Sequence, residues 1–137
     1  MRILLDTNII LDLLLDRVPF SDDAAKIFSL IEKKEIEGFI CATTVTTISY
    51  FLQKSLGKAE SREILGNILN IFEIAEVNKN ILHSAQKSEF NDFEDAVIYQ
   101  AARVNKIKAI ITRNKNDFTN SKIVVLDARE FLKSFIN

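Results

Sequence analysis

Several residue types that often carry chemistry are scarce in this chain of 137 residues. There is one histidine (His83), one cysteine (Cys41) and no tryptophan. A mechanism that needs two histidines is therefore excluded, and a structural zinc site is disfavoured because it usually takes four cysteine and histidine ligands. A single cysteine cannot form an internal disulfide. Cys41 lies in an apolar run, where we expect a buried thiol.

Glycine and proline are also rare, with three and one in the whole chain. The sequence therefore has no flexible linker, no low-complexity segment and no glycine-rich loop for phosphate. Hydrophobic residues make up 47% of the chain, which is enough for one core at the commonest domain size. We expect residues 1–137 to form a single domain.

No apolar run approaches the roughly 18 residues that suggest a membrane span. The first residues, Met-Arg, lead into charged sequence rather than a cleavable signal. We therefore expect a cytoplasmic protein that does not engage a membrane. Lysine and arginine total 18 against 19 acidic residues, for a net charge of −1. A global basic field is thus absent, although a local patch can still bind phosphate, and the candidates are Lys54 with Lys58 and Arg62, or Arg113 with Lys115.

Short apolar runs alternate with segments of helical periodicity. Strands are predicted at residues 3–5, 39–41, 72–77, 109–111 and 123–126. Helices are predicted at residues 7–16, 21–34, 43–56, 59–71, 78–87, 92–104 and 127–135. Expected helix caps are Ser21, Thr43 or Thr44, Asp92 and Asp127, with Gly57 as a stop. This alternation predicts an α/β fold with a mainly parallel sheet covered by helices on both faces.

Acidic residues follow two of the predicted strands. Asp6 comes directly after residues 3–5, and Asn114 and Asp117 follow residues 109–111. Ligands of open parallel sheets bind outside the carboxyl ends of the strands, so we expect these side chains to meet. Two carboxylates about 4 Å apart repel by about 4 kcal/mol at an effective dielectric near 20, which favours a bound cation. Oxygen ligands suit Mg²⁺ or Mn²⁺.

A third acidic group begins the predicted helix 92–104. Asp92 is its natural N-cap, which leaves Asp95 at the edge of an apolar helix face, where an unpaired carboxylate is costly. Asp92 therefore accounts for the cap and leaves Asp95 needing another reason, and the metal interpretation rests on the joint occurrence of these acidic residues at strand and helix ends. Simpler interpretations stay open for the other two, because Asp6 can cap the helix that begins at Thr7 and Asp117 can bond its own turn.

The motifs of this chain, taken together, resemble those of the PIN domain family. They are LLDTNIILDLLLDR, ATTVTTISYFLQK, DFEDAVIYQAA and IITRNKNDF, followed by the closing strand and helix, and they span nearly the whole chain. The resemblance implies a PIN-like three-layer α/β/α fold with a central, mainly parallel sheet of about five strands. It also implies a Mg²⁺- or Mn²⁺-dependent endoribonuclease, often the toxin of a bacterial toxin–antitoxin pair, with RNA as substrate and a small antitoxin protein as partner.

The same resemblance assigns roles to individual residues. Asp6, Asp95 and Asp117 are expected to hold the metal and to be catalytic. The residues expected to orient the ligands or the substrate are Thr7, Asn8, Thr47, Glu94, Thr112, Arg113 and Asn114. Two departures stand out, because Thr47 replaces a glutamate and Asn114 an aspartate that many members have. Glu94 or Asp12 could supply the missing carboxylate.

Two other functions compete with this interpretation. The departures at Thr47 and Asn114 favour a catalytically weak PIN-like module that binds RNA. A phosphotransfer domain of the phosphatase or receiver type is disfavoured, because it needs a further acidic residue near Asp6, where Asn8 stands. Residues 43–72 carry more apolar helix surface than one modest sheet can cover, so we also expect a two-fold homodimer.

Overall fold

The computed structural model describes residues 1–136, which are built around a sheet of five parallel strands. The strands are β1 (Arg2–Leu5), β2 (Glu37–Cys41), β3 (Glu73–Ala75), β4 (Ala109–Ile111) and β5 (Val124–Leu126). Their order across the sheet is β3-β2-β1-β4-β5. β1 is thus central, and its Leu4 lies opposite Phe39 of β2 and Ile110 of β4.

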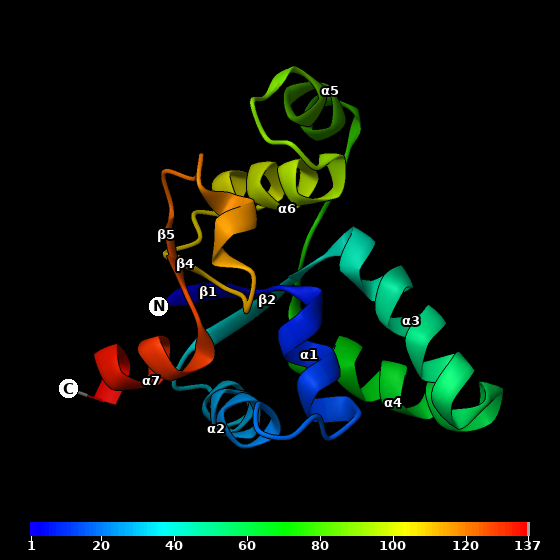
Figure 1. Ribbon diagram of the computed structural model, residues 1–137. Helices are drawn as coiled ribbons and strands as arrows, with labels where there is room; N and C mark the ends of the chain where they lie inside the picture. Colours follow the sequence, from blue (N-terminus) through cyan, green and yellow to red (C-terminus); the bar gives the residue numbers. More distant parts are fainter. Residues whose placement is uncertain (137) are drawn as a thin grey trace.

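Helices cover both faces of the sheet. They are α1 (Thr7–Leu14), α2 (Ser21–Glu32), α3 (Ala42–Leu56), α4 (Lys58–Ile71), α5 (Lys79–Lys87), α6 (Phe93–Val104) and α7 (Ala128–Ile136), with a 3₁₀ turn at Lys115–Phe118. In Figure 1, α5 and α6 lie above the sheet, whereas α1, α2, α4 and α7 lie below it. The predicted three-layer α/β/α fold with a parallel central sheet is confirmed.

The central strand contributes to the core on both faces. Side chains alternate across a strand, so Ile3 and Leu5 point to one face and Leu4 to the other. Ile3 and Leu5 pack in a cluster with Ile27 of α2 and Phe131 of α7, and Leu4 packs with side chains of α5 and α6. A strand buried on both faces needs an unbroken apolar run, which explains Ile3-Leu4-Leu5.

Two of the predicted helix caps are wrong. Ser21 lies inside α2, whose N-cap position is Phe20 without a side-chain hydrogen bond. α3 begins at Ala42, so Thr43 and Thr44 are also helical. The reason is burial: Ser21 and Thr44 are enclosed by neighbouring elements, and the Thr44 hydroxyl accepts a hydrogen bond from the Thr7 hydroxyl at 3.3 Å. Tertiary contacts therefore override the local preference of Ser and Thr for caps.

The other predicted caps are confirmed. Asp92 Oδ2 accepts a hydrogen bond from Asp95 N (3.0 Å) at the start of α6, and Asp127 Oδ1 accepts one from Glu130 N (2.8 Å) at the start of α7. Gly57 ends α3 with a φ of 85°, a conformation that glycine adopts without strain.

β2 begins two residues earlier than predicted, at Glu37. It passes through Gly38, where a Cβ would lie 2.5 Å from Ile31 Cδ1, so only glycine lets the strand approach α2 this closely. At the other end of β2, Cys41 is buried, as predicted, and burial raises the pKa of its thiol. Within residues 1–136, no helix is long and apolar enough to cross a membrane.

Candidate active site

Asp6 lies where β1 ends and α1 begins. Its Oδ1 accepts a hydrogen bond from Thr7 N (2.8 Å), so Asp6 caps α1. Its Oδ2 accepts hydrogen bonds from the Thr112 hydroxyl (2.8 Å) and from Asn8 Nδ2 (3.5 Å). These contacts leave Asp6 only 7% exposed and fix the direction of its carboxylate. Capping and a role in the site are thus compatible functions of one side chain.

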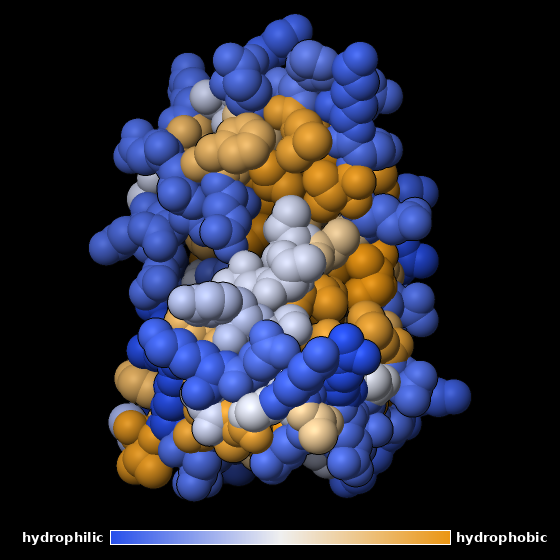
Figure 2. Space-filling model, turned by 90° about the vertical axis from the view of Figure 1, so that its right-hand side faces the viewer, coloured by the Kyte–Doolittle hydropathy of each residue, from blue (hydrophilic) through white to orange (hydrophobic). Residues whose placement is uncertain are grey.

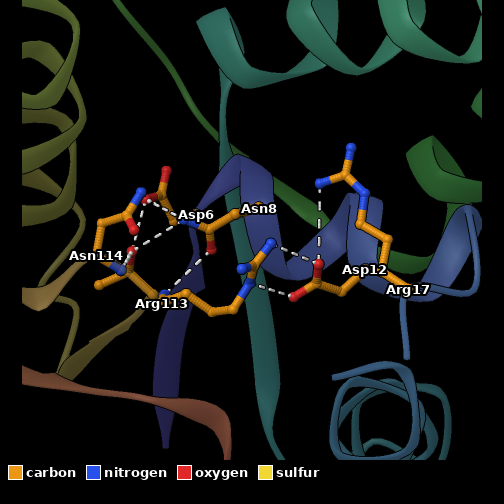
Figure 3. Close-up of polar contacts among 7 residues, drawn as sticks. Asp6, Asn8, Asp12, Arg17, Arg113 and Asn114 are labelled. Carbon is orange, nitrogen blue, oxygen red and sulfur yellow. Dashed lines mark hydrogen bonds and ion pairs between the residues drawn. The ribbon is translucent and has the colours of Figure 1, made fainter. Parts of the chain in front are cut away.

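A small polar network ties the end of β4 to α1 (Figure 3). Asp6 N donates to Ile111 O (2.9 Å), and Arg113 N donates to Asn8 Oδ1 (3.2 Å). The Thr112 hydroxyl oxygen accepts hydrogen bonds from Asn8 Nδ2 (3.3 Å) and from Asn114 N (3.0 Å). Asn8 and Thr112 therefore fix the position of the segment after β4 relative to Asp6.

Asp6 opens into a pocket of about 290 Å³ at the carboxyl ends of β1 and β4. The other acidic residues that line this acidic pocket are Asp92, Glu94 and Asp95 from the start of α6 and Asp117 from the 3₁₀ turn. The remaining lining residues are Thr7, Asn8, Leu11, Arg17, Phe51 and Asn114. The structure therefore brings together the three predicted metal-binding aspartates, which are 89 and 22 residues apart along the chain.

Repulsion between these carboxylates perturbs their protonation. Burial and, in addition, the charges of Asp6, Asp92, Asp117 and Glu94 raise the pKa of Asp95 to about 7. Burial also raises the pKa of Asp6, with a further contribution from Asp117, against the opposing effect of the Thr112 and Thr7 hydrogen bonds. The pKa of Glu94 is raised by burial and then by Asp92 and Asp6. The pocket thus concentrates negative charge.

The donor atoms of the pocket fit a hard cation. The acidic side chains and Asn114 offer oxygen ligands, and neighbouring carboxylates that repel one another are stabilised by a positive ion between them. In the part of the chain that the structure describes, no group of three Asp, Glu, His or Cys side chains is already drawn close enough to enclose one ion. Mg²⁺ commonly binds one or two carboxylates and completes its shell with water and substrate phosphate, which this open arrangement permits.

Asp12 does not contribute to the acidic pocket, so the expectation that it supplies a missing carboxylate is wrong. It is fully buried, and its two oxygens accept hydrogen bonds from Arg113 Nε (2.8 Å) and Nη2 (2.9 Å). Six residues along a helix rotate a side chain by about 240°, which turns Asp12 away from Asp6. Glu94, by contrast, does line the pocket.

Acidic side chains engage both Arg113 and Lys115, the pair that the sequence suggests as a local phosphate-binding patch. The Arg113 guanidinium bonds Asp12 and lies 4.1 Å from the ring centroid of Phe20. Lys115 Nζ lies 2.7 Å from Glu130 Oε1 and 3.9 Å from Asp127 Oδ2. Both cations are therefore paired, and Arg113 reaches the polar network near Asp6 through its backbone amide.

Thr47 is not among the residues that line the acidic pocket. Its hydroxyl donates to Thr43 O (3.3 Å) within α3. The residue one turn later, Phe51, does line the pocket, as does Arg17 from the segment after α1. Sequence reasoning missed both, because an aromatic residue at helical spacing resembles core and an isolated arginine resembles ordinary surface charge.

Asp95→Asn should stabilise the metal-free protein at neutral to alkaline pH. The pKa of Asp95 is about 7 in the folded protein, against an ordinary value of 3.8. The folded state therefore favours the protonated carboxyl group, and the stability that this group contributes is fully present below pH 3.8 and is lost as pH rises through 7. Asparagine carries no charge and avoids that loss. After solvent screening, we expect a gain of about 1 kcal/mol at pH 8.

Thermal unfolding in a chelator at pH 5 and pH 8 measures this effect. The gain should be larger at pH 8. Asp22→Asn, which changes an exposed carboxylate in α2, is the matched control and should show no such difference. Equal stabilisation by Asp95→Asn at both pH values would contradict the electrostatic explanation.

Comparisons of the sequence with known proteins identify relatives of this chain. A sequence model of the PIN domain matches residues 2–116. Ribonuclease VapC1 from Aquifex aeolicus (strain VF5) is 26% identical over 135 residues, which cover 95% of this chain and 92% of that protein.

Solved structures show the same fold. VapBC2 from Rickettsia felis, crystallised with a DNA fragment from its promoter, superposes with a TM-score of 0.70 at 19% identity over 93% of this chain and 98% of that one. A toxin–antitoxin complex from Klebsiella pneumoniae gives a TM-score of 0.69 at 22% identity over 91% and 96%. The toxin VapC20 of Mycobacterium tuberculosis, which cleaves the sarcin-ricin loop, gives 0.64 at 13% identity over 79% and 86%. Because the family model spans most of the sequence, this chain belongs to the PIN domain family.

Proposed function

We propose that this chain is a metal-dependent endoribonuclease that hydrolyses RNA phosphodiester bonds as the toxin of a toxin–antitoxin pair. The observation that carries the proposal is the convergence of Asp6, Asp95 and Asp117 in one pocket of a PIN domain. The similarity to Ribonuclease VapC1 over nearly its whole length supports the same activity.

In this proposal Asp6, Asp95 and Asp117 hold Mg²⁺ or Mn²⁺, and Glu94 and Asn114 lie at the edge of the same pocket. An ion bound by these aspartates would make a water molecule more acidic and would offset negative charge on the phosphate. Thr7 and Thr112 orient the Asp6 carboxylate before any substrate arrives. Such preorganisation avoids reorganisation during the reaction. Asn8 supports it by bonding Thr112 and the backbone after β4.

Arg17 is suited to bind the RNA backbone. Among the described residues it is the basic side chain that lines the acidic pocket, and its Nη1 lies 3.9 Å from Asp12 Oδ1. Figure 3 shows Arg17 above the buried Asp12 carboxylate, which also binds Arg113. The Arg17 guanidinium offers a planar fork of donors that matches phosphate oxygens.

Arg17→Met should weaken RNA binding uniformly across sequences. We expect the slope of log affinity against log salt concentration to fall by about 0.7, the value for one phosphate contact on a single strand. Filter binding in the Asp6→Asn background, which avoids cleavage, measures it. Arg103→Met removes the same charge from an exposed site on α6 and should leave the slope unchanged. An unaltered slope in Arg17→Met would remove Arg17 from the RNA site.

The proposed activity is tested by incubating the purified chain with a mixed RNA pool. Cleavage that requires Mn²⁺ or Mg²⁺ and stops in a chelator supports the nuclease. RNA binding without cleavage would favour the alternative suggested by Thr47 and Asn114, a PIN-like module that binds RNA. Expression of the chain alone in a bacterium should arrest growth, and unimpaired growth with well-folded protein would count against the toxin.

The antitoxin in this proposal is a small protein that inserts an arginine into the acidic pocket. The similarity to solved toxin–antitoxin complexes supports such a partner. A guanidinium can bond two carboxylate oxygens at once and relieve the repulsion around Asp95. Because it competes with the metal for the same aspartates, inhibition weakens as the Mn²⁺ concentration rises.

We also propose a two-fold homodimer through α3 and α4. Much of the apolar surface that predicted it is used internally, because Ile48, Leu52 and Ile68 are buried in the core. Tyr50 and Leu69 remain 61% and 47% exposed. In Figure 2, hydrophobic surface lies in the upper part and to the right of the middle of the face shown, whereas the lower part, at the height of α4 in Figure 1, is mainly hydrophilic. Sedimentation equilibrium should give twice the monomer mass of 15.6 kDa, and a mass of 15.6 kDa would refute the dimer.

A further inference from the structure

A second cavity, of about 390 Å³, lies next to the acidic pocket and shares Asn114 with it. Its lining residues are Ile9 and Asp12 of α1, Pro19, Phe20 and Asp23 around the start of α2, Arg113 after β4, and Asp127, Ala128 and Arg129 at the start of α7. Cavities of this size hold small molecules or single nucleotides. The proposed hydrolysis makes no use of it.

One wall of this cavity is a rigid stack of planar groups. Asp12, which is fully buried, binds two nitrogens of Arg113 at 2.8 and 2.9 Å. The same guanidinium lies 4.1 Å from the ring centroid of Phe20, which remains 42% exposed. Burying an ion pair costs desolvation free energy, which offsets much of the attraction between the two charges. What the Asp12–Arg113 pair most directly provides is a fixed orientation of Arg113 and Phe20.

The chemistry of the cavity suits an uncharged planar ligand with hydrogen-bonding edges. Unpaired bases of RNA stack on aromatic rings and on arginine planes, and the exposed ring of Phe20, with Arg113 against it, offers such a surface. Asp23 and Arg129 pair across the rim at 3.3 Å and, with Asn114, supply donors and acceptors. The charges in the lining nearly balance, which disfavours a site for free phosphate.

We propose that this cavity binds an unpaired nucleobase of RNA next to the phosphate in the acidic pocket, and so sets the sequence preference of cleavage. The effect on cleavage rests on the proposed nuclease function, whereas base binding does not. Asn114 lines both cavities, so a base bound here adjoins the acidic pocket. In the competing explanation, the Asp12–Arg113–Phe20 stack only fastens β4 to the segment between α1 and α2.

Base binding is tested by NMR titration of the whole chain with the four nucleoside 5′-monophosphates and with ribose 5-phosphate. At least one nucleotide should shift the amide signals of Asn114, Ala128 and Arg129, and ribose 5-phosphate should not. Phe20→Leu keeps an apolar side chain but removes the ring, and should weaken binding roughly tenfold. Tyr50→Leu, an exposed aromatic change that lines neither cavity, should have no effect.

A second variant, at an exposed position, tests the proposal independently in case Phe20→Leu does not fold. Arg129→Ala changes a side chain that is 72% exposed and should also weaken nucleotide binding. Equal shifts with ribose 5-phosphate, or unchanged affinity in both variants, would overturn the proposal.

Mapping of RNA cleavage ends separates this proposal from the nuclease function. Phe20→Leu and Arg129→Ala should alter the base preferred at a position beside the cut. RNA cleavage with the same preference in both variants and no nucleotide binding would refute the base site and keep the nuclease. Nucleotide binding by a wild-type chain that does not cut RNA would support the base site and refute the nuclease function.

Discussion

Asp6→Asn is expected to reduce metal-dependent RNA cleavage by at least a hundredfold and to leave the fold intact. Loss of a residue that only supports a metal ligand commonly costs about 10- to 100-fold, and loss of a ligand itself costs at least that much. Asparagine retains an oxygen that can accept the hydrogen bond from Thr7 N, so the cap of α1 survives. It also removes a charge whose burial is unfavourable.

Initial rates of RNA cleavage at saturating Mn²⁺, together with thermal unfolding, measure both parts of this prediction. Asn78→Asp is a useful control because Asn78 also caps a helix, with its Oδ1 accepting a hydrogen bond from Ile81 N, and it does not line the pocket. It should cleave at the wild-type rate. Cleavage by Asp6→Asn at the wild-type rate would reduce Asp6 to a helix cap.

Asp12→Ala is expected to be the most destabilising single substitution among the acidic residues, by about 3 kcal/mol. Removal of one partner from a buried ion pair typically costs 3–5 kcal/mol because the other charge is left without compensation. Arg113 is 30% exposed and can regain some water, which places the loss at the low end. For a chain of this size we expect the melting temperature to fall by roughly 10 °C.

A double substitution separates charge from packing. Asp12→Leu with Arg113→Met replaces the pair by apolar groups of similar volume and should recover much of the lost stability. Glu76→Ala, at an exposed position without an ion pair among the described residues, should unfold close to the wild-type temperature. A loss below about 1 kcal/mol in Asp12→Ala would mean that the pair contributes little to folding.

Local sequence signals were sufficient for the architecture. Apolar runs of three to five residues between helical periodicities specify buried parallel strands, and the carboxyl ends of such strands necessarily share one edge of the sheet. Asp6 and Asn114 could therefore be placed at that edge from their positions after residues 3–5 and 109–111. Asp92 and Asp127 were correct as caps because an N-cap bond involves only residues three apart in sequence.

Side-chain partners across elements could not be predicted in the same way. Asp12 and Arg113 are 101 residues apart, and nothing in the local sequence shows that they bond each other instead of facing the acidic pocket. Ser21 and Thr44 are of residue types that often cap helices, yet both lie inside helices, where they are buried against other elements. Arg17 and Phe51 had no local signal that separates a pocket lining from surface or core.

The sequence by itself determined the fold class and the edge of the sheet at which Asp6, Asn114 and Asp117 lie, a set of oxygen donors of the kind that hard cations take. Periodicity and chain order fix these properties, since both are local or topological. The tertiary structure alone decided which charges lie close together. Four other carboxylates repel Asp95, and Asp12 forms an ion pair with Arg113, which lies against the Phe20 ring. Such pairings depend on distances between packed elements, and no short stretch of sequence encodes them.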